Sequence, residues 1–172
     1  MCPMSKINRT FEIKPVAADD RERARIILTE EWGSARVVSR GKIYQADMLP
    51  GFMAMTDNVP VGLVTFNIEA GSCEIVTLNS RRERIGIGAA LIEAVRRTAS
   101  EAGCRRLWLI TTNDNTHALR FYQRFGFVIK AVHANAVAES RKLKPEIPIL
   151  GYDNIPIRDE IELELILQTL AE

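Results

Sequence analysis

The clearest periodic pattern lies in the second half of the chain. Between residues 88 and 102, apolar side chains recur at helical spacing and Gly103 follows as a typical helix end. Residues 105–113 hold a short unbroken apolar run, which indicates a strand covered on both faces. Residues 73–80 also have the composition of a strand. A helix between two such strands predicts a right-handed crossover unit whose strands are parallel.

Shorter patterns predict the remaining elements. Strands are expected at 10–16, 127–133 and 160–167, and as a hairpin over 52–71 that turns at "TDN" and Pro60. Helices are expected at 18–33 and 115–126, with one or two helical turns at 136–143.

Two segments have no clean period. Residues 34–51 are predicted to form a loop or short helix, and residues 144–159 form a loop interrupted by prolines. The whole order predicts one α/β (α+β) domain over residues 1–172. It would hold a mixed, twisted sheet of about six or seven strands with helices on both faces.

Composition places this chain among ordinary globular proteins. Of the 172 residues, 47% are hydrophobic and 26% charged, and the formal net charge is +1. This balance gives no general attraction to nucleic acid or membranes, so an anion site must be local. No signal-peptide pattern or membrane-spanning run is present, which favours the cytoplasm. The three cysteines, Cys2, Cys73 and Cys104, lack metal-ligand spacing, so free thiols and no metal are expected.

A glycine loop precedes the periodic helix, in the stretch "SRRERIGIGAALIEAV" (80–95). A helix N-terminus leaves backbone N–H groups unpaired and carries a partial positive charge, so anions bind there. Gly86 and Gly88 allow close approach of a phosphate, and Arg81, Arg82 and Arg84 add charge. The alternative is a tight turn that only requires glycine. The fingerprints of nucleotide and dinucleotide phosphate loops are absent.

A second stretch, "NDNTHALRFYQRFGF" (113–127), contains N-x-x-A-x-x-F-Y-x-x-x-G-F and follows the glycine loop by about 30 residues. Together, the two stretches resemble the GNAT superfamily of acetyl-CoA-dependent N-acetyltransferases over roughly residues 60–133. The resemblance implies acetyl-CoA as co-substrate, with its pyrophosphate on backbone N–H groups of the loop and its pantetheine arm beside the preceding strand. It also implies that Asn115 touches this arm and that Tyr122 lies near the sulfur.

The implied cofactor-binding positions are the strand residues Val76, Leu78 and Ser80, the loop residues Arg84, Ile85, Gly86, Ile87, Gly88 and Ala89, and Asn115. The sequence departs from the family pattern at Glu83, where a glutamine or arginine is usual. A neighbouring arginine would then supply the charge, or the loop would act through its backbone alone.

Amine acetylation poses two proton problems. Tyr122 is the candidate general acid for the leaving thiolate, with core packing as the alternative role. Glu74 is the candidate base for the incoming ammonium, with a water chain, a solvent-facing position or an arginine pair as alternatives. A backbone N–H near Leu78 would stabilise the oxyanion.

Other candidates are weaker. His117 is expected to be exposed and His133 structural, while Trp32, Tyr44 and the loop 144–159 are candidate contacts for the acceptor. The alternative for this loop is that it only runs over the surface and does not contact the acceptor.

The predicted function is acetyl transfer to a primary amine of a small molecule or peptide, by direct attack in a ternary complex. The alternative is a non-catalytic acyl-CoA-binding sensor or interaction module. No nucleic-acid or membrane partner is expected, and a homodimer and the identity of the acceptor stay open.

Overall fold

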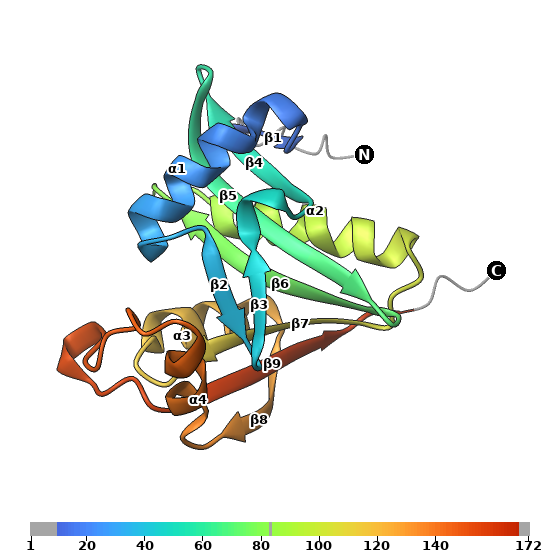
Figure 1. Ribbon diagram of the computed structural model, residues 1–172. Helices are drawn as coiled ribbons and strands as arrows, with labels where there is room; N and C mark the ends of the chain where they lie inside the picture. Colours follow the sequence, from blue (N-terminus) through green and yellow to red (C-terminus); the bar gives the residue numbers. More distant parts are fainter. Residues whose placement is uncertain (1–9, 83, 169–172) are drawn as a thin grey trace.

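The central feature is a seven-stranded sheet with the order β1-β4-β5-β6-β7-β9-β8 (Figure 1). The computed structural model describes residues 10–82 and 84–168. Strands β6 and β7 pair in parallel, and the other neighbours in this sheet are antiparallel. The strands are β1 Glu12–Pro15, β4 Gly51–Thr56, β5 Val59–Glu69, β6 Ser72–Ser80, β7 Arg106–Thr112, β8 Val128–His133 and β9 Glu160–Ile166.

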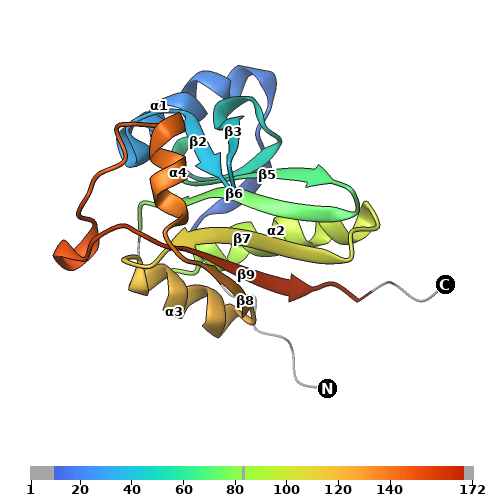
Figure 2. The same cartoon turned by 60° about the horizontal axis from the view of Figure 1, so that its bottom comes forward.

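Helices cover both faces of this sheet (Figure 2). Helices α2 (Ile87–Glu101) and α3 (Thr116–Phe125) lie on one face, and α1 (Arg21–Trp32) and α4 (Ala136–Leu143) on the other. Short 3-10 turns occupy Ala18–Asp20, Ala46–Met48 and Tyr152–Asn154. The predicted mixed sheet with helices on both faces is therefore confirmed, as is the parallel pair on either side of the long helix.

The prediction for residues 34–51 was wrong. This segment forms a two-stranded antiparallel ribbon, β2 (Arg36–Ser39) and β3 (Lys42–Gln45), before its 3-10 turn. The two-residue turn consists of Arg40 and Gly41, whose φ angles are 47° and 75°. Positive φ at both positions is typical of a tight hairpin. We refer to β2 and β3 as the ribbon, and to the sheet face that it covers as the ribbon face.

The opposite face carries the main apolar core, and we call it the apolar face. The stripe on α2, formed by Leu91, Ile92 and Val95, is buried against this face. Along β9 the side chains alternate, so that Leu163 points into this core while Glu162 lies on the ribbon face. Each fully buried aliphatic side chain contributes roughly 1.5–3 kcal/mol to folding.

Cys73 and Cys104 are free thiols within the same core, as expected. Burial raises the pKa of Cys73 to about 12, so this thiol stays protonated at neutral pH. Cys2 lies outside the described residues.

Helix α4 is tied to the ribbon through main-chain atoms. Lys144 is buried, and its Nζ donates to the carbonyl oxygens of Arg36 at 2.9 Å and of Trp32 at 3.4 Å. In return, Arg36 Nη2 donates to the carbonyl oxygen of Leu143 at 3.2 Å. These contacts fasten the end of α4 to β2 and to the end of α1, whereas most of residues 145–158 are exposed.

The following loop is also anchored. Asn113 Oδ1 accepts from the backbone N–H groups of Arg158 and Asp159, both at 2.9 Å. Gly151 packs so closely that a Cβ there would lie 1.9 Å from Asp114 Oδ2. Among the described residues, no helix is long and apolar enough to cross a membrane.

Candidate active site

The pairing of the parallel strands β6 and β7 ends about halfway along β6. Their pairing runs from Ser72 opposite Arg106 to Ile75 opposite Leu109, although β6 continues to Ser80. On its other side, β6 pairs Ile75 with Phe66 and then Thr77 with Thr65, which leaves Val76 as an extra residue. Such a β-bulge bends its strand and is frequent beside active sites. The bulge explains why β6 turns away from β7 at this point.

Beyond the bulge, β6 has a backbone edge that β7 does not pair. Leu78 and Asn79 on β6 are half-buried, as are residues 110–112 on β7, although both strands lie inside the sheet. An open edge of this kind can receive an amide-bearing chain as if it were another strand. Of the predicted arm-binding positions, Val76 is buried, Leu78 packs on the apolar core and Ser80 is exposed.

The N-terminus of α2 follows this open edge. Gly86 caps the helix, and the first backbone hydrogen bond joins Ala90 N–H to Gly86 O at 3.0 Å. The preceding N–H groups, at Ile87, Gly88 and Ala89, therefore precede the helical hydrogen-bond ladder. The first turn contains no acidic residue, so its partial positive charge is not neutralised from within the helix.

The two glycines of this loop serve different purposes. Gly86 has φ +83°, and a Cβ there would meet no atom within 4 Å. Its backbone is thus both in the left-handed region and openly accessible. A Cβ on Gly88 would lie 3.1 Å from Phe121 Cζ, so Gly88 allows α2 to pack on α3. Gly86 can therefore both form the tight turn and leave its backbone open to an anion. Gly88, in contrast, makes room for Phe121 where α2 packs on α3.

The arginines of the loop also differ from one another. Arg81 forms ion pairs with Glu30 and Glu31 of α1, the second at 3.8 Å. It therefore fastens the loop to α1. Arg84 and Ile85 are exposed beside the helix start, as is Arg82. Glu83, where the sequence departs from the family pattern, lies outside the described residues.

Asn115 and Tyr122 belong to α3. The side-chain oxygen of Asn115 caps this helix by accepting from Ala118 N–H at 3.1 Å, so its amide nitrogen is the atom that would serve a ligand. Tyr122 lies in the apolar core, with its ring edge-to-face against Phe121 and Phe127 at centroid distances of 5.3 and 5.6 Å. Burial raises the pKa of Tyr122 above its usual value, which keeps the phenol protonated.

Glu74 lies on the ribbon face, one residue before the pairing with β7 ends. Its Oε1 accepts from Ser39 Oγ, and its Oε2 accepts from Tyr44 Oη at 2.7 Å. The carboxyl group is buried, and among the described residues it forms no ion pair with an arginine. Burial raises the pKa of Glu74, although the two hydroxyl donors oppose this shift. A raised pKa suits a carboxylate that accepts a proton near neutral pH.

The two candidate catalytic residues therefore lie on opposite faces of the sheet. Tyr122 lies on the apolar face, in the same core as Ile75 and Leu109. Glu74 lies beneath the ribbon. A ligand that passes between β6 and β7 would have a phenol on one side and a carboxylate on the other.

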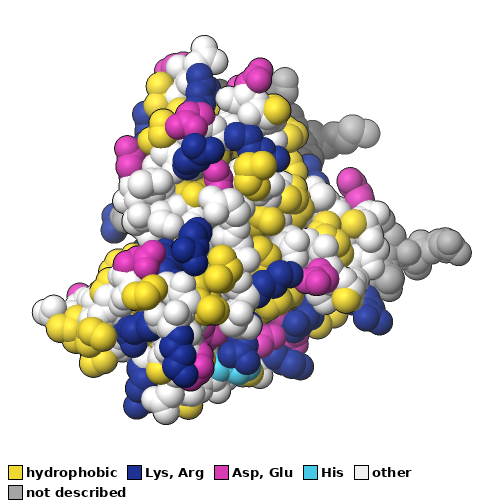
Figure 3. All heavy atoms as spheres, in the orientation of Figure 1, with side chains coloured by type: hydrophobic (Ala, Val, Ile, Leu, Met, Phe, Trp, Pro, Cys, Tyr) yellow, Lys and Arg dark blue, Asp and Glu magenta, His cyan; other side chains and the backbone are white. Residues whose placement is uncertain are grey.

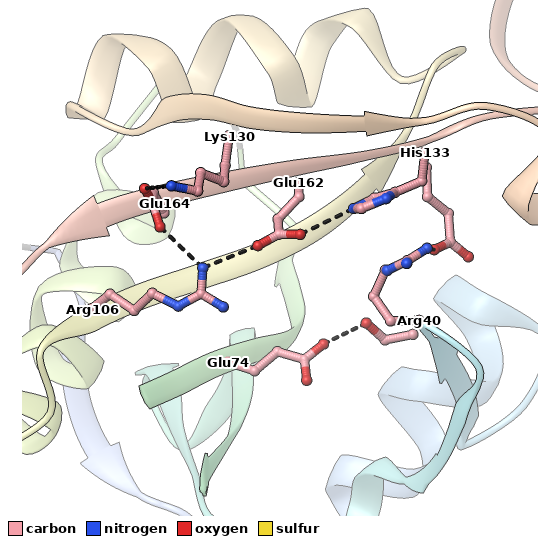
Figure 4. A network of polar contacts seen from close by, with 9 residues as sticks. Arg40, Glu74, Arg106, Lys130, His133, Glu162 and Glu164 are labelled. Carbon is pink, nitrogen blue, oxygen red and sulfur yellow. Dashed lines mark hydrogen bonds and ion pairs between the residues drawn. The ribbon is translucent and has the colours of Figure 1, made fainter. Parts of the chain in front are cut away.

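An ion-pair network extends across the ribbon face (Figure 4). Arg106 Nη1 lies 3.0 Å from both Glu162 Oε1 and Glu164 Oε2. His133 Nε2 lies 3.0 Å from Glu162, and Lys130 Nζ lies 3.3 Å from Glu164. This contact with Glu162 agrees with the structural, rather than catalytic, role expected for His133.

The ribbon tip reaches β9 as well. Arg40 Nη1 lies 3.4 Å from Glu160 Oε2, and Ser140 of α4 donates to Glu160 Oε1 at 2.6 Å. His117 is exposed, as predicted. Trp32 Nε1 donates to Asn79 Oδ1 on β6 at 2.9 Å, so this predicted acceptor contact lies beside the open edge. On the face shown in Figure 3, basic and acidic side chains are interspersed.

Comparisons with known proteins agree with this geometry. Residues 15–127 match the acetyltransferase (GNAT) family. The uncharacterized protein YxbD of Bacillus subtilis is 42% identical over 159 residues, covering 92% of this chain and 100% of that protein. The aminoglycoside N(6')-acetyltransferase type 1 of Salmonella typhimurium is 32% identical over 105 residues, covering 54% and 72%. A solved GNAT family acetyltransferase from Elizabethkingia anophelis, with acetyl-CoA bound, has a TM-score of 0.64 at 20% identity, covering 92% and 99%.

This chain belongs to the GNAT family of acetyltransferases. The family resemblance and the fold expected from the sequence are thereby confirmed.

Proposed function

We propose that this protein transfers the acetyl group of acetyl-CoA to a primary amine of a small molecule or peptide, by direct attack in a ternary complex. The proposal rests on two adjacent features, an unpaired strand edge and the N-terminus of a helix. The strand edge freed by the bulge at Val76 leads directly to the N–H groups of residues 87–89, which precede the hydrogen-bond ladder of α2. Coenzyme A needs both features, because its pantetheine arm carries amides and its diphosphate is an anion.

The protein's own residues supply two proton transfers. Tyr122, held protonated by burial, donates a proton to the leaving sulfur. Glu74 receives a proton from the incoming ammonium, which must be neutral to attack. The sequence similarity to an aminoglycoside acetyltransferase supports an amine as the acceptor. The acetyl-CoA complex of a protein with the same fold supports acetyl-CoA as the donor.

Binding is tested by changing the start of α2. Gly86→Val should weaken coenzyme A binding, measured by isothermal titration calorimetry, because a Cβ blocks backbone approach. The matched control is Gly103→Val, because Gly103 follows the other end of α2 with φ +74° and equally open space. Both variants carry similar backbone strain. Equal affinity losses in the two variants would contradict a diphosphate site at Gly86.

Catalysis is tested with a panel of amines, comprising kanamycin, spermidine, free amino acids and short peptides, with thiol release as the readout. Tyr122→Phe should lower turnover at least about tenfold and leave coenzyme A affinity unchanged. Thr56→Val is the control, because it removes a hydroxyl of β4 that donates to the carbonyl oxygen of Thr10 at 3.0 Å. Coenzyme A binding without thiol release from any amine would instead favour the non-catalytic alternative.

A further inference from the structure

Glu74 occupies a closed polar site that the ribbon builds around it. Each carboxylate oxygen accepts a hydrogen bond from one ribbon hydroxyl, Oε1 from Ser39 and Oε2 from Tyr44. The three side chains are only 4%, 6% and 7% exposed, in the order Glu74, Ser39, Tyr44. Burying a carboxylate is unfavourable unless its oxygens are bonded. The ribbon therefore maintains an ionisable group at the closed end of the parted strands, where apolar side chains would otherwise fill the space.

The two hydroxyls have different surroundings. Tyr44 is packed in a second cluster of buried apolar residues, which includes Val37 and Val76 and is separate from the main core. Lys42 Nζ lies 5.0 Å from the centre of the Tyr44 ring. Ser39 is the last residue of β2 and precedes the exposed tip of the ribbon at Arg40. Ser39 is thus the hydroxyl nearer to the exposed tip of the ribbon along the chain, whereas Tyr44 is held among buried apolar residues.

We propose that Ser39 relays the acceptor's proton to Glu74, and that Tyr44 is a positioning residue that holds the carboxylate. The inference rests on the proposed acetyl transfer and adds the route by which the buried base is reached. A serine hydroxyl can donate and accept at once. The bond from Ser39 to Glu74 uses the serine proton and leaves the hydroxyl oxygen able to accept another.

The transfer balances as follows. One N–H bond of the acceptor's ammonium breaks, and its proton binds Ser39 Oγ while the serine's own proton passes to Glu74 Oε1. The electron pair left on nitrogen becomes available for attack, and Glu74 becomes a neutral carboxylic acid. Tyr44 continues to donate to Oε2 throughout.

Other charged groups act on Glu74 from the surrounding elements. From the ribbon, Lys42 favours the carboxylate; from β9, Glu162 disfavours it; and Cys73 is its neighbour in β6. Burial outweighs the hydroxyl donors and Lys42, so the pKa of Glu74 is raised. Removing a hydroxyl donor removes a hydrogen bond that is stronger with the carboxylate than with the neutral acid, and so raises this pKa further.

The first experiment needs no acceptor. Carbon-13 NMR of glutamate side-chain carboxyl carbons follows the titration of Glu74, which Glu74→Gln assigns by loss of its signal. Tyr44→Phe should raise the apparent pKa of Glu74 by roughly one unit. Ser39→Ala should also raise it, whereas Ser39→Thr retains a hydroxyl and should stay near the wild-type value. An unchanged titration in Tyr44→Phe would overturn its positioning role.

The second experiment measures turnover with whichever panel amine supports thiol release. Ser39→Ala should lower kcat at least about tenfold with little change in KM for acetyl-CoA, and Ser39→Thr should restore most of it. Full activity of Ser39→Ala, or equally slow Ser39→Thr, would overturn the relay. If the wild type binds coenzyme A but acetylates no amine, the proposed function and with it the relay fail, while the NMR result still judges the positioning of Glu74.

A matched control separates chemistry from folding. Thr65→Val removes another buried hydroxyl from the same sheet, which is hydrogen bonded to Thr77 at 2.7 Å and is not one of the two hydroxyls that donate to Glu74. This variant should lower the melting temperature much as Ser39→Ala does, without moving the Glu74 titration or kcat. A similar loss of kcat in Thr65→Val would mean that the Ser39 effect is only structural, and would overturn the relay.

Discussion

Strand β9 presents two different surfaces to the two sides of the sheet. On the apolar face, Ile161 and Leu163 are buried among aliphatic and aromatic side chains. On the ribbon face, Glu162 and Glu164 are held by Arg106 and by Lys130 and His133 of β8. The first surface is stable whatever the pH, because its energy comes from exclusion of water. The second depends on particular partners and their protonation, and it is the face that holds Glu74.

The largest effect is expected on the apolar face. Leu163→Ala should lower the free energy of unfolding by about 2–5 kcal/mol, since it leaves a cavity in a fully buried site. Urea denaturation measures the loss. The control is Ile166→Ala on the same strand, because Ile166 is 65% exposed. Similar losses in the two variants would remove the distinction between the faces.

A smaller and pH-dependent effect is expected on the ribbon face. Burial tends to raise the pKa of Glu162, but hydrogen bonds from His133 and Arg106 bring it below its ordinary value. Its stabilisation is therefore present above the unfolded-state pKa and is lost as the pH falls through the folded-state pKa. Arg106→Met should cost roughly 1–3 kcal/mol at neutral pH, and less near pH ~4.

The same urea titration, repeated across pH, measures this dependence. Arg97→Met is the matched control, because Arg97 is exposed on α2 and pairs with Glu93 at 3.5 Å. That variant should show almost no loss. An Arg106→Met deficit that stays constant down to pH ~4 would mean that charge pairing is not its cause.

The smallest effect is expected for an ion pair in solvent. Lys142 Nζ lies 2.8 Å from Glu139 Oε1 on α4, and both side chains are about 70% exposed. Lys142→Ala should change the free energy of unfolding by less than ~0.5 kcal/mol, because water screens the pair. A loss above 1 kcal/mol, on the order of a buried hydrogen bond, would contradict this prediction. It would show that a solvent-exposed ion pair stabilises α4 as much as a buried contact does.

Much of the scaffold was predictable because it follows from local patterns. Each pattern indicates how many faces of an element are buried. The examples are the apolar stripe on α2, the unbroken apolar run of β7 and the strict alternation of β9. The glycine loop was predictable because helix starts and glycine backbones have few alternative uses. Family resemblance then supplied expected roles for Asn115 and Tyr122, which stay predictions and which spacing alone left open.

The ribbon was missed for an identifiable reason. Val37 and Val38 are adjacent apolar residues, so the segment lacks alternation, and Gly41 was counted as a break. Two runs of four residues separated by two, the second of which is glycine, were the available signal. The Ser39–Glu74 contact had no such signal, because it joins residues 35 positions apart through side chains. Sequence reasoning did name Tyr44, but as a contact for the acceptor rather than a partner of Glu74.

The buried ammonium of Lys144 has a consequence for how this protein can vary. Its acceptors are peptide oxygens of residues 32 and 36, which every amino acid possesses. Substitutions at those two positions therefore leave the acceptors in place. The side chains at these two positions can therefore change while the end of α4 remains fastened to β2 and α1.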